Sequence, residues 1–149
     1  MPKNHHPPMH SAEHILNQTM VRMFDCGRCV NAHVEEKKSR IDYRFDRDVT
    51  PEEIREIERR VNEVISSDVP VTEEFLARDE AERLFSLKKL PGDAGERIRI
   101  VRIGDYDACP CSGPHVRSSG EIGVFRIISS GYSGGLVRLR FKLESPGSR

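Results

Sequence analysis

The sequence lacks any long apolar run, any low-complexity tract and any net charge. No stretch approaches the ~20 consecutive apolar residues that a helix needs to cross a bilayer. The amino-terminal residues also lack the apolar segment of a signal peptide, so a cytoplasmic protein without membrane attachment is expected. Hydrophobic residues make up 36% and charged residues 32% of the 149 positions, and the clear periodic segments argue against disorder.

The absence of net charge hides an uneven distribution. The 24 basic and 24 acidic side chains cancel, which excludes a general attraction of the whole chain to nucleic acid. Residues 85–149, however, contain 11 basic and 6 acidic side chains, whereas residues 46–84 contain 6 and 13. A basic surface in the carboxyl-terminal part could bind a polyanion; solvation of exposed faces is the alternative explanation of the same charges.

Cysteine is also scarce, with four residues in the chain. In the cytosol, cysteines are more often reduced, metal-bound or catalytic than paired in disulfides. Cys26-x-x-Cys29 and Cys109 could form a redox pair or, if their loops meet, a second zinc site, although a fourth donor for that site is not evident. Cys109 could also compete with Cys111 as a ligand in the site described next.

Two short motifs contain the residues best suited to chemistry. His10-Ser-Ala-Glu-His14 places two imidazoles on one face of a predicted helix. Cys111-Ser-Gly-Pro-His115 lies in a loop rich in proline and glycine, and it could complete a nitrogen and sulfur set suited to zinc. Glu13 is expected to point away from the histidine face and to lie on the helix surface.

Three other interpretations of these motifs have to be considered. The histidines could be surface or capping residues near a chain terminus. Four protein ligands could also form a purely structural zinc site, because a hydrolytic zinc usually keeps a position for water or substrate. The pattern H-x-x-E-H occurs in inverted zinc peptidases as well, but those enzymes need a much larger fold and a distal acidic ligand, where this chain has Cys-x-x-x-His.

Periodicity and turn residues predict an α+β fold. Helices are expected from about residue 10, just after Pro7-Pro8, to residue 24, and then over 51–66 and 78–85. The middle helix has the clearest signal, because Thr50-Pro51-Glu52-Glu53 forms a capping box with proline at the first helical position. Strands are predicted at 39–46, 69–76, 97–103, 123–130 and 136–143, with a loop at 90–95. Together they predict a single domain over residues 1–149, with a mostly antiparallel sheet packed with two to three helices.

The two motifs resemble those of the editing domain of alanyl-tRNA synthetase, and more closely those of short, free-standing alanyl-tRNA editing proteins of the threonyl and alanyl-tRNA synthetase second additional domain family. The matching segments are 10–16 and 108–123, and the resemblance covers nearly the whole chain. It implies an aminoacyl-tRNA deacylase that hydrolyses the ester joining serine or glycine to alanine tRNA. It also implies that Zn²⁺ is the cofactor, and that its ligands are His10, His14, Cys111 and His115.

The resemblance also implies catalytic and RNA-binding residues. Gly113, Gly120 and Glu121 lie in turns whose backbone N–H groups could approach a developing oxyanion, and no general base is evident. Ser112 and Pro114 stand where the family often has a glycine and a threonine. The threonine by which the family discriminates serine has no counterpart at 29–33, which leaves the amino-acid specificity open. The expected partner is the acceptor end of tRNA, and the candidate contacts are Lys37, Lys38, Lys88, Lys89, Arg117, Arg138 and Arg140. The alternatives are a non-catalytic, zinc-stabilised RNA-binding module and a hydrolase of another aminoacyl ester.

Overall fold

The computed structural model describes residues 6–85 and 96–144, and it confirms the predicted α+β class with antiparallel pairing. The elements in chain order are α1 (Pro7–Phe24), β1 (Asn31–His33), β2 (Ser39–Arg44), α2 (Pro51–Ser66), β3 (Val71–Ala77), α3 (Arg78–Leu84), β4 (Arg97–Ile103), β5 (Asp107–Pro110), the 3-10 helix η1 (Ser119–Glu121), β6 (Val124–Ser133) and β7 (Leu136–Glu144). None of the helices in the described residues is long and apolar enough to span a membrane.

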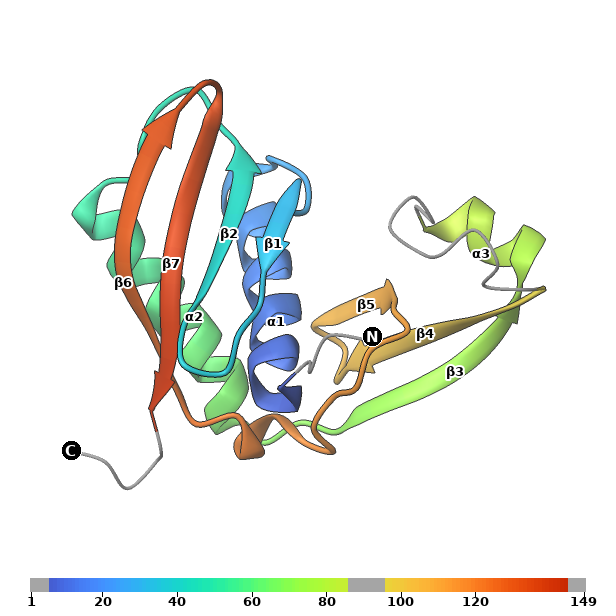
Figure 1. Ribbon diagram of the computed structural model, residues 1–149. Coiled ribbons are helices and arrows are strands. Elements are labelled where there is room, and N and C mark those ends of the chain that lie inside the picture. Colours follow the sequence, from blue (N-terminus) through green and yellow to red (C-terminus); the bar gives the residue numbers. More distant parts are fainter. Residues whose placement is uncertain (1–5, 86–95, 145–149) are drawn as a thin grey trace.

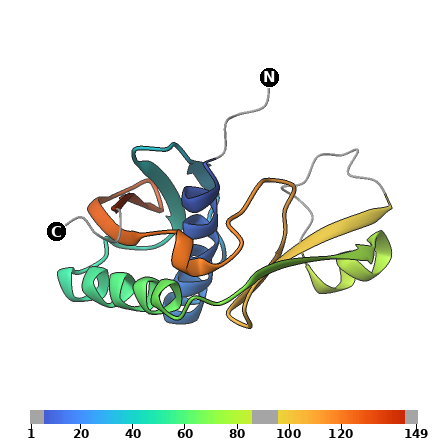
Figure 2. The same ribbon diagram turned by 90° about the horizontal axis from the view of Figure 1, so that it is seen from below.

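The strands form two sheets instead of one. The first has the order β1-β2-β7-β6, and the second has the order β3-β4-β5. Helices α1 and α2 lie against one face of the four-stranded sheet, whereas the three-stranded sheet projects to the side with α3 near its far end (Figure 1). We refer to β3, β4, β5 and α3 as the arm. Seen from below, α1 lies between the four-stranded sheet and the arm (Figure 2).

Helix α1 begins three residues earlier than predicted, at Pro7. Prolines are tolerated in the first turn because the N–H groups that they lack have no partner within a helix there. The side chain of His6 accepts a hydrogen bond from the N–H of Met9, which caps this end. The other end is closed by Asp25 in the left-handed conformation, with φ of 54°, and not by the glycine two residues later.

Most of α1 is buried, polar side chains included. Met9, Ile15 and Leu16 have no exposed surface, and they pack in the main core with large residues of the four-stranded sheet such as Tyr43 and Phe141. Helix α2 has the predicted bounds, and both hydrogen bonds of its capping box are present. The first two turns of α1 are also largely buried, although they contain polar groups such as His10, Ser11 and His14.

The arm has a small core of its own, formed by Ala81, Ile98 and Ile100. Its strand β3 is shifted by one to two residues from the prediction, and β5 was not predicted at all. The hairpin of β6 and β7 is present, with a turn at Gly134 and Gly135, both of which have positive φ. The predicted loop at 90–95 lies outside the described residues.

Candidate metal centre

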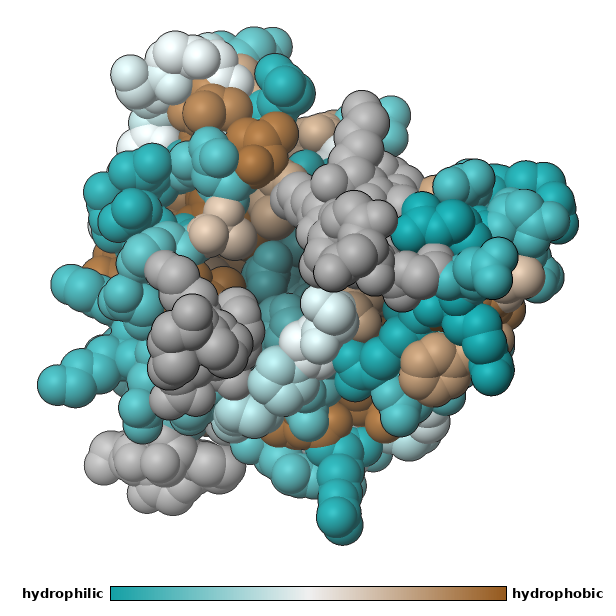
Figure 3. Space-filling view, turned by 45° about the vertical axis from the view of Figure 1, so that its right-hand side comes forward, coloured by the Kyte–Doolittle hydropathy of each residue, from teal (hydrophilic) through white to brown (hydrophobic). Residues whose placement is uncertain are grey.

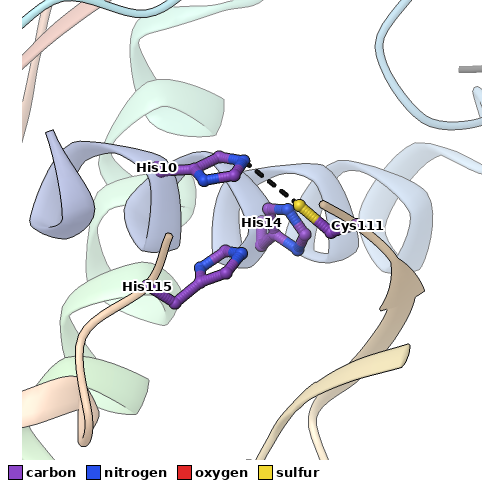
Figure 4. A group of neighbouring side chains, drawn as sticks. All are labelled: His10, His14, Cys111 and His115. Carbon is purple, nitrogen blue, oxygen red and sulfur yellow. Dashed lines mark hydrogen bonds between the residues drawn. The ribbon is translucent and has the colours of Figure 1, made fainter. Parts of the chain in front are cut away.

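The four predicted ligands come together from two segments of the chain. Helix α1 supplies His10 and His14, and the loop after β5 supplies Cys111 and His115 (Figure 4). One nitrogen or sulfur atom from each residue can be chosen so that all four lie within 4.8 Å of one another. His10 Nε2 is 3.4 Å from Cys111 Sγ. This is the one group in the described part of the chain that could hold a metal ion; Cys26, Cys29 and Cys109 form no second one there.

The loop is held in place by backbone contacts with the arm and α1. The N–H of Cys111 donates to the carbonyl of Arg99 on β4, and the guanidinium of Arg99 donates in return to the carbonyls of Cys111 and Gly113 at 3.0 and 2.8 Å. Farther along the loop, the N–H of Val116 donates to Ser11 Oγ at 3.2 Å. The loop therefore connects β4 to the amino-terminal turns of α1.

Gly113 allows the loop to approach α1 closely. A Cβ atom added at this position would lie 2.4 Å from Cε1 of His10 and 2.9 Å from its Nδ1. Real Cβ atoms essentially never approach another heavy atom so closely. The N–H of Gly113 donates to Cys111 Sγ at 3.4 Å, so in this structure it faces the sulfur of the group.

Each imidazole directs Nδ1 toward an oxygen outside the group. His10 Nδ1 lies 2.9 Å from the carbonyl oxygen of Pro114, which can only accept, so Nδ1 carries a hydrogen and Nε2 faces the group. His115 Nδ1 is 2.9 Å from Ser11 Oγ, and His14 Nδ1 is 3.6 Å from Asp107 Oδ2. Outer oxygens in this arrangement are typical of metal-bound histidines, because they fix the tautomer and the orientation of the ring.

A metal ion fits this group. His115 Nε2 is buried and has no hydrogen-bond partner, and a buried nitrogen without a partner is costly. Three imidazole nitrogens and one sulfur match the donor types that zinc takes. Metal coordination would satisfy the buried nitrogen, and the existing contacts of Nδ1 would not have to change.

The charges of the two cysteines in this region differ strongly. Burial alone would raise the pKa of Cys111, but the imidazoles of His10, His115 and His14 outweigh it and lower that pKa to about 3. Burial raises the pKa of Cys109 to about 12. Because the thiolate is the form that binds metals, Cys111 is the better ligand, in agreement with what the family resemblance implies.

The pKa values of His115 and His14 are shifted in opposite directions. Burial lowers the pKa of His115 to about 4, so this imidazole stays neutral at pH 7. Burial would also lower the pKa of His14, but Asp107 and the Cys111 sulfur outweigh it and raise the value to about 9. A bound cation would compete with the proton on His14, because metal binding requires a neutral imidazole.

Glu13 corrects one sequence prediction, because its side chain does not point away from the histidines. Its Oε1 atom lies 3.8 Å from His10 Nε2, and the side chain is only 14% exposed. The thiol of Cys29 donates to Oε2, with an S···O distance of 3.8 Å. Residues three apart on a helix are neighbours, so Glu13 lies beside His10.

The other predicted catalytic residues lie in η1, and their role stays a prediction. The N–H of Gly120 donates to Asp68 Oδ1 at 3.0 Å, and a Cβ at this position would collide with that carboxylate. The carboxylate of Glu121 accepts a hydrogen bond from the hydroxyl of Ser118 at 3.3 Å. The contact of Gly120 with Asp68 thus joins η1 to the end of α2, whereas that of Glu121 is local.

The predicted RNA-binding residues lie in several places. Lys37, Lys38 and Arg117 are exposed, whereas Lys88 and Lys89 lie outside the described residues. Arg138 donates to both oxygens of Asp42, at 2.8 and 3.0 Å. Arg140 is exposed on β7 and pairs with Arg40 on β2.

Comparison with known proteins confirms the resemblance that the motifs predict. Residues 98–140 match the family model described as threonyl and alanyl tRNA synthetase second additional domain, and this segment includes Cys111 and His115. The chain is also 38% identical over 138 residues to the alanine–tRNA ligase of Methylococcus capsulatus, and 35% identical over 136 residues to that of Methanopyrus kandleri. These alignments cover 87% and 89% of this chain but only 15% of each relative. The chain thus spans a small part of the length of these relatives.

Proposed function

We propose that this protein is an aminoacyl-tRNA deacylase that hydrolyses the ester bond of mischarged tRNA, with Zn²⁺ held by His10, His14, Cys111 and His115. The observation that supports this most is the convergence of the four ligands around a buried nitrogen that has no other partner. The similarity to alanine–tRNA ligases supports tRNA as the substrate. The proposed substrates are serine or glycine esters of alanine tRNA, cleaved in trans.

The residues of the chain would prepare the site before any substrate arrives. Pro114 and Ser11 hold Nδ1 of two histidines, which directs Nε2 toward the group. Gly113 leaves space for the loop and donates its N–H to the sulfur of Cys111, a contact that favours the thiolate. When bound, zinc would polarise the ester carbonyl or lower the pKa of a water molecule.

Glu13 is the proposed proton acceptor. It is a carboxylate next to the ligand group, with Oε1 3.8 Å from His10 Nε2, and it is held from the other side by the thiol of Cys29. A general base has to lie within hydrogen-bond reach of the attacking water, directly or through one more water. Glu13 is placed to take that proton and to hold it at Oε1.

The outer face of the four-stranded sheet is the proposed surface for the tRNA backbone. Arg40 on β2 lies opposite Arg140 on β7, and His33 on β1 pairs with Arg40, so these three residues form a row across three strands. Like charges directly opposite each other destabilise a sheet. Phosphates bound along the row would remove that repulsion.

Two further basic side chains lie beside this row. Arg126 on β6 pairs with Lys142 on β7, on the same face of the sheet. The surface seen in Figure 3 is mainly hydrophilic, both on the arm and on the part with the four-stranded sheet. Because β1 is the edge strand on the side of the arm (Figure 1), an RNA strand that follows the row leads toward α1 and the ligand group.

A deacylation assay tests the proposed activity. Purified protein with bound zinc is expected to release serine and glycine from alanine tRNA much faster than it releases alanine. H10A is expected to remain folded at low temperature and to lose turnover. Intact esters of serine, glycine and alanine after prolonged incubation with stoichiometric, zinc-loaded protein would contradict the proposal.

A zinc-stabilised RNA-binding module without catalytic activity is the second candidate. The observation that favours it is the full set of four protein ligands, which is typical of structural zinc sites. In that case H10A should unfold together with loss of the metal, and tRNA binding should disappear at the same time. A folded H10A protein that binds tRNA but does not cleave the ester would reject this candidate.

A further inference from the structure

Asp107 is a buried carboxylate next to the ligand group that no sequence motif assigned. It is the first residue of β5, and its side chain has no exposed surface. Burial of a carboxylate is costly unless cations and hydrogen-bond donors surround it. The contacts of Asp107 are therefore informative about its role.

Two residues hold the carboxylate in place. Arg28 Nη1 donates to Oδ1 at 2.7 Å, and its Nη2 is 3.3 Å from Oδ2. The amide of Gln18 on α1 donates to Oδ1 at 2.9 Å. Arg22 donates in turn to the amide oxygen of Gln18, which turns the amide NH₂ toward Asp107. Oδ1 thus accepts the two shorter hydrogen bonds, whereas Oδ2 accepts only the longer one from Arg28 and can interact with a further partner.

That partner is the imidazole of His14. Oδ2 lies 3.6 Å from His14 Nδ1, and both side chains are almost completely buried. The distance is longer than a hydrogen bond, but a carboxylate can only accept. Its field therefore favours the tautomer with hydrogen on Nδ1, which leaves the lone pair of Nε2 for the group. The carbonyl of Pro114, which also can only accept, faces Nδ1 of His10 in the same way, and the hydroxyl of Ser11 contacts Nδ1 of His115.

We propose that Asp107 is a positioning residue for the metal site: it fixes the tautomer and orientation of His14, and Arg28 and Gln18 hold its carboxylate in place. The inference rests on the metal site of the proposed function. It goes beyond the ligand set, because it assigns a role to three residues outside both motifs. Asp107 touches neither substrate nor metal in this role.

Metal affinity is the property that tests this role. D107N keeps the size of the side chain and removes its charge, and D105N makes the same change at an exposed position two residues earlier. Zinc affinity of the metal-free proteins is measured by competition with a chromogenic chelator. We expect D107N to bind zinc about 10- to 100-fold more weakly than the wild type, and D105N to match the wild type.

Cobalt binding separates positioning from general destabilisation. Co²⁺ in a site of three imidazoles and one thiolate gives visible absorption bands that report its geometry. D107N is expected to shift these bands even at saturating Co²⁺, whereas a purely structural role predicts an unchanged spectrum in the folded fraction. D107E should restore part of the affinity, because it restores the charge.

Several outcomes would overturn the inference. A folded D107N protein with wild-type zinc affinity and an unchanged cobalt spectrum contradicts it, even if the wild type is an active deacylase. If D107N does not fold, R28Q is measured in its place, and unchanged affinity and spectrum there contradict the inference in the same way. The two proposals can also fail separately. If D107N binds zinc more weakly than the wild type, but the wild type cleaves no aminoacyl-tRNA, the positioning role of Asp107 is supported and the proposed deacylase activity is rejected.

Discussion

Substitution of Gly113 by alanine tests the site where the ligand loop approaches the ring of His10 most closely. The new Cβ would lie 2.4 Å from His10 Cε1, whereas ordinary contacts begin at 3.4 Å, so the loop and the ring would have to separate by about 1 Å. The φ angle of Gly113 is not in the left-handed region, so the backbone itself accepts alanine. The effect is therefore expected to be steric, and to act on one of the four ligands.

The size of the expected effects on stability and activity follows from the contacts that are lost when His10 and the loop move apart. The hydrogen bond between His10 Nδ1 and the carbonyl of Pro114 is 2.9 Å long and cannot survive a separation of this size. We expect a destabilisation of about 1–3 kcal/mol from overpacking, and a loss of about 100-fold in kcat/KM, because a misplacement of roughly 1 Å can cost that much. Zinc affinity should fall as well.

The assays are thermal unfolding, zinc competition and deacylation of Ser-tRNA. G131A is the matched control, because no atom lies within 4 Å of a Cβ at that position and its φ is not positive either. G131A should behave like the wild type in all three assays. A G113A protein with wild-type zinc affinity and wild-type turnover would refute the reasoning. It would mean that the ring of His10 can be displaced by the new methyl group without any effect on the site.

Three further predictions concern the metal, the RNA surface and acid stability. C111S is expected to lose zinc binding while C109S keeps it, as measured by metal analysis after dialysis; equal loss in both would point to Cys109 as a ligand. R140E should weaken tRNA binding several-fold and reduce its salt dependence, since a phosphate contact is lost; R55E, the same change at an exposed position of α2, should not. The hydrogen bonds from Arg138 lower the pKa of Asp42 in the folded protein below its ordinary 3.8. The ion pair therefore stabilises the folded protein fully above pH 3.8, and this stabilisation is lost as the pH falls through the lower pKa of the folded state. Unfolding between pH 6 and pH 2 should therefore show a weaker acid dependence in R138Q, and an identical pH profile in both proteins would contradict the assignment.

Local signals predicted those parts of the structure that local interactions determine. The helix after Thr50 has the predicted bounds because its capping box and its apolar positions agree. The ligand group could also be predicted, because the spacing within each motif limits the chemistry that the residues can perform. Strand β5 was missed because it has only four residues and ends in Cys109-Pro110, which carry no alternating pattern.

The surroundings of the site could not be predicted, since they depend on tertiary contacts. Asp107 looks like any acidic residue after a turn, and only the fold brings it to Arg28, which lies 79 positions earlier. The helical spacing that puts His10 and His14 on one face predicts a surface position for Glu13, because residue 13 lies off that face. The structure differs because residue 13 is also a neighbour of residue 10 on the helix, and because the thiol of Cys29, from a distant loop, holds the carboxylate there.

The metal site depends on how the arm is fastened to α1. Part of this connection is apolar, because Ile103 of β4 is buried in the main core together with α1, and Val71 of β3 packs against that core; only the part of the arm around Ala81, Ile98 and Ile100 has a separate core. Tyr106 adds polar contacts to this connection: its hydroxyl is 2.6 Å from Thr19 Oγ1, and the guanidinium of Arg22 lies 4.1 Å from the centre of the Tyr106 ring and donates to its carbonyl. Since two ligands come from α1 and two from the loop after β5, the spacing of the ligand pairs depends on these contacts together with those that bind the loop directly to α1. Metal binding should in turn stabilise the position of the arm, because an ion that needs all four ligands binds only when the two parts are together.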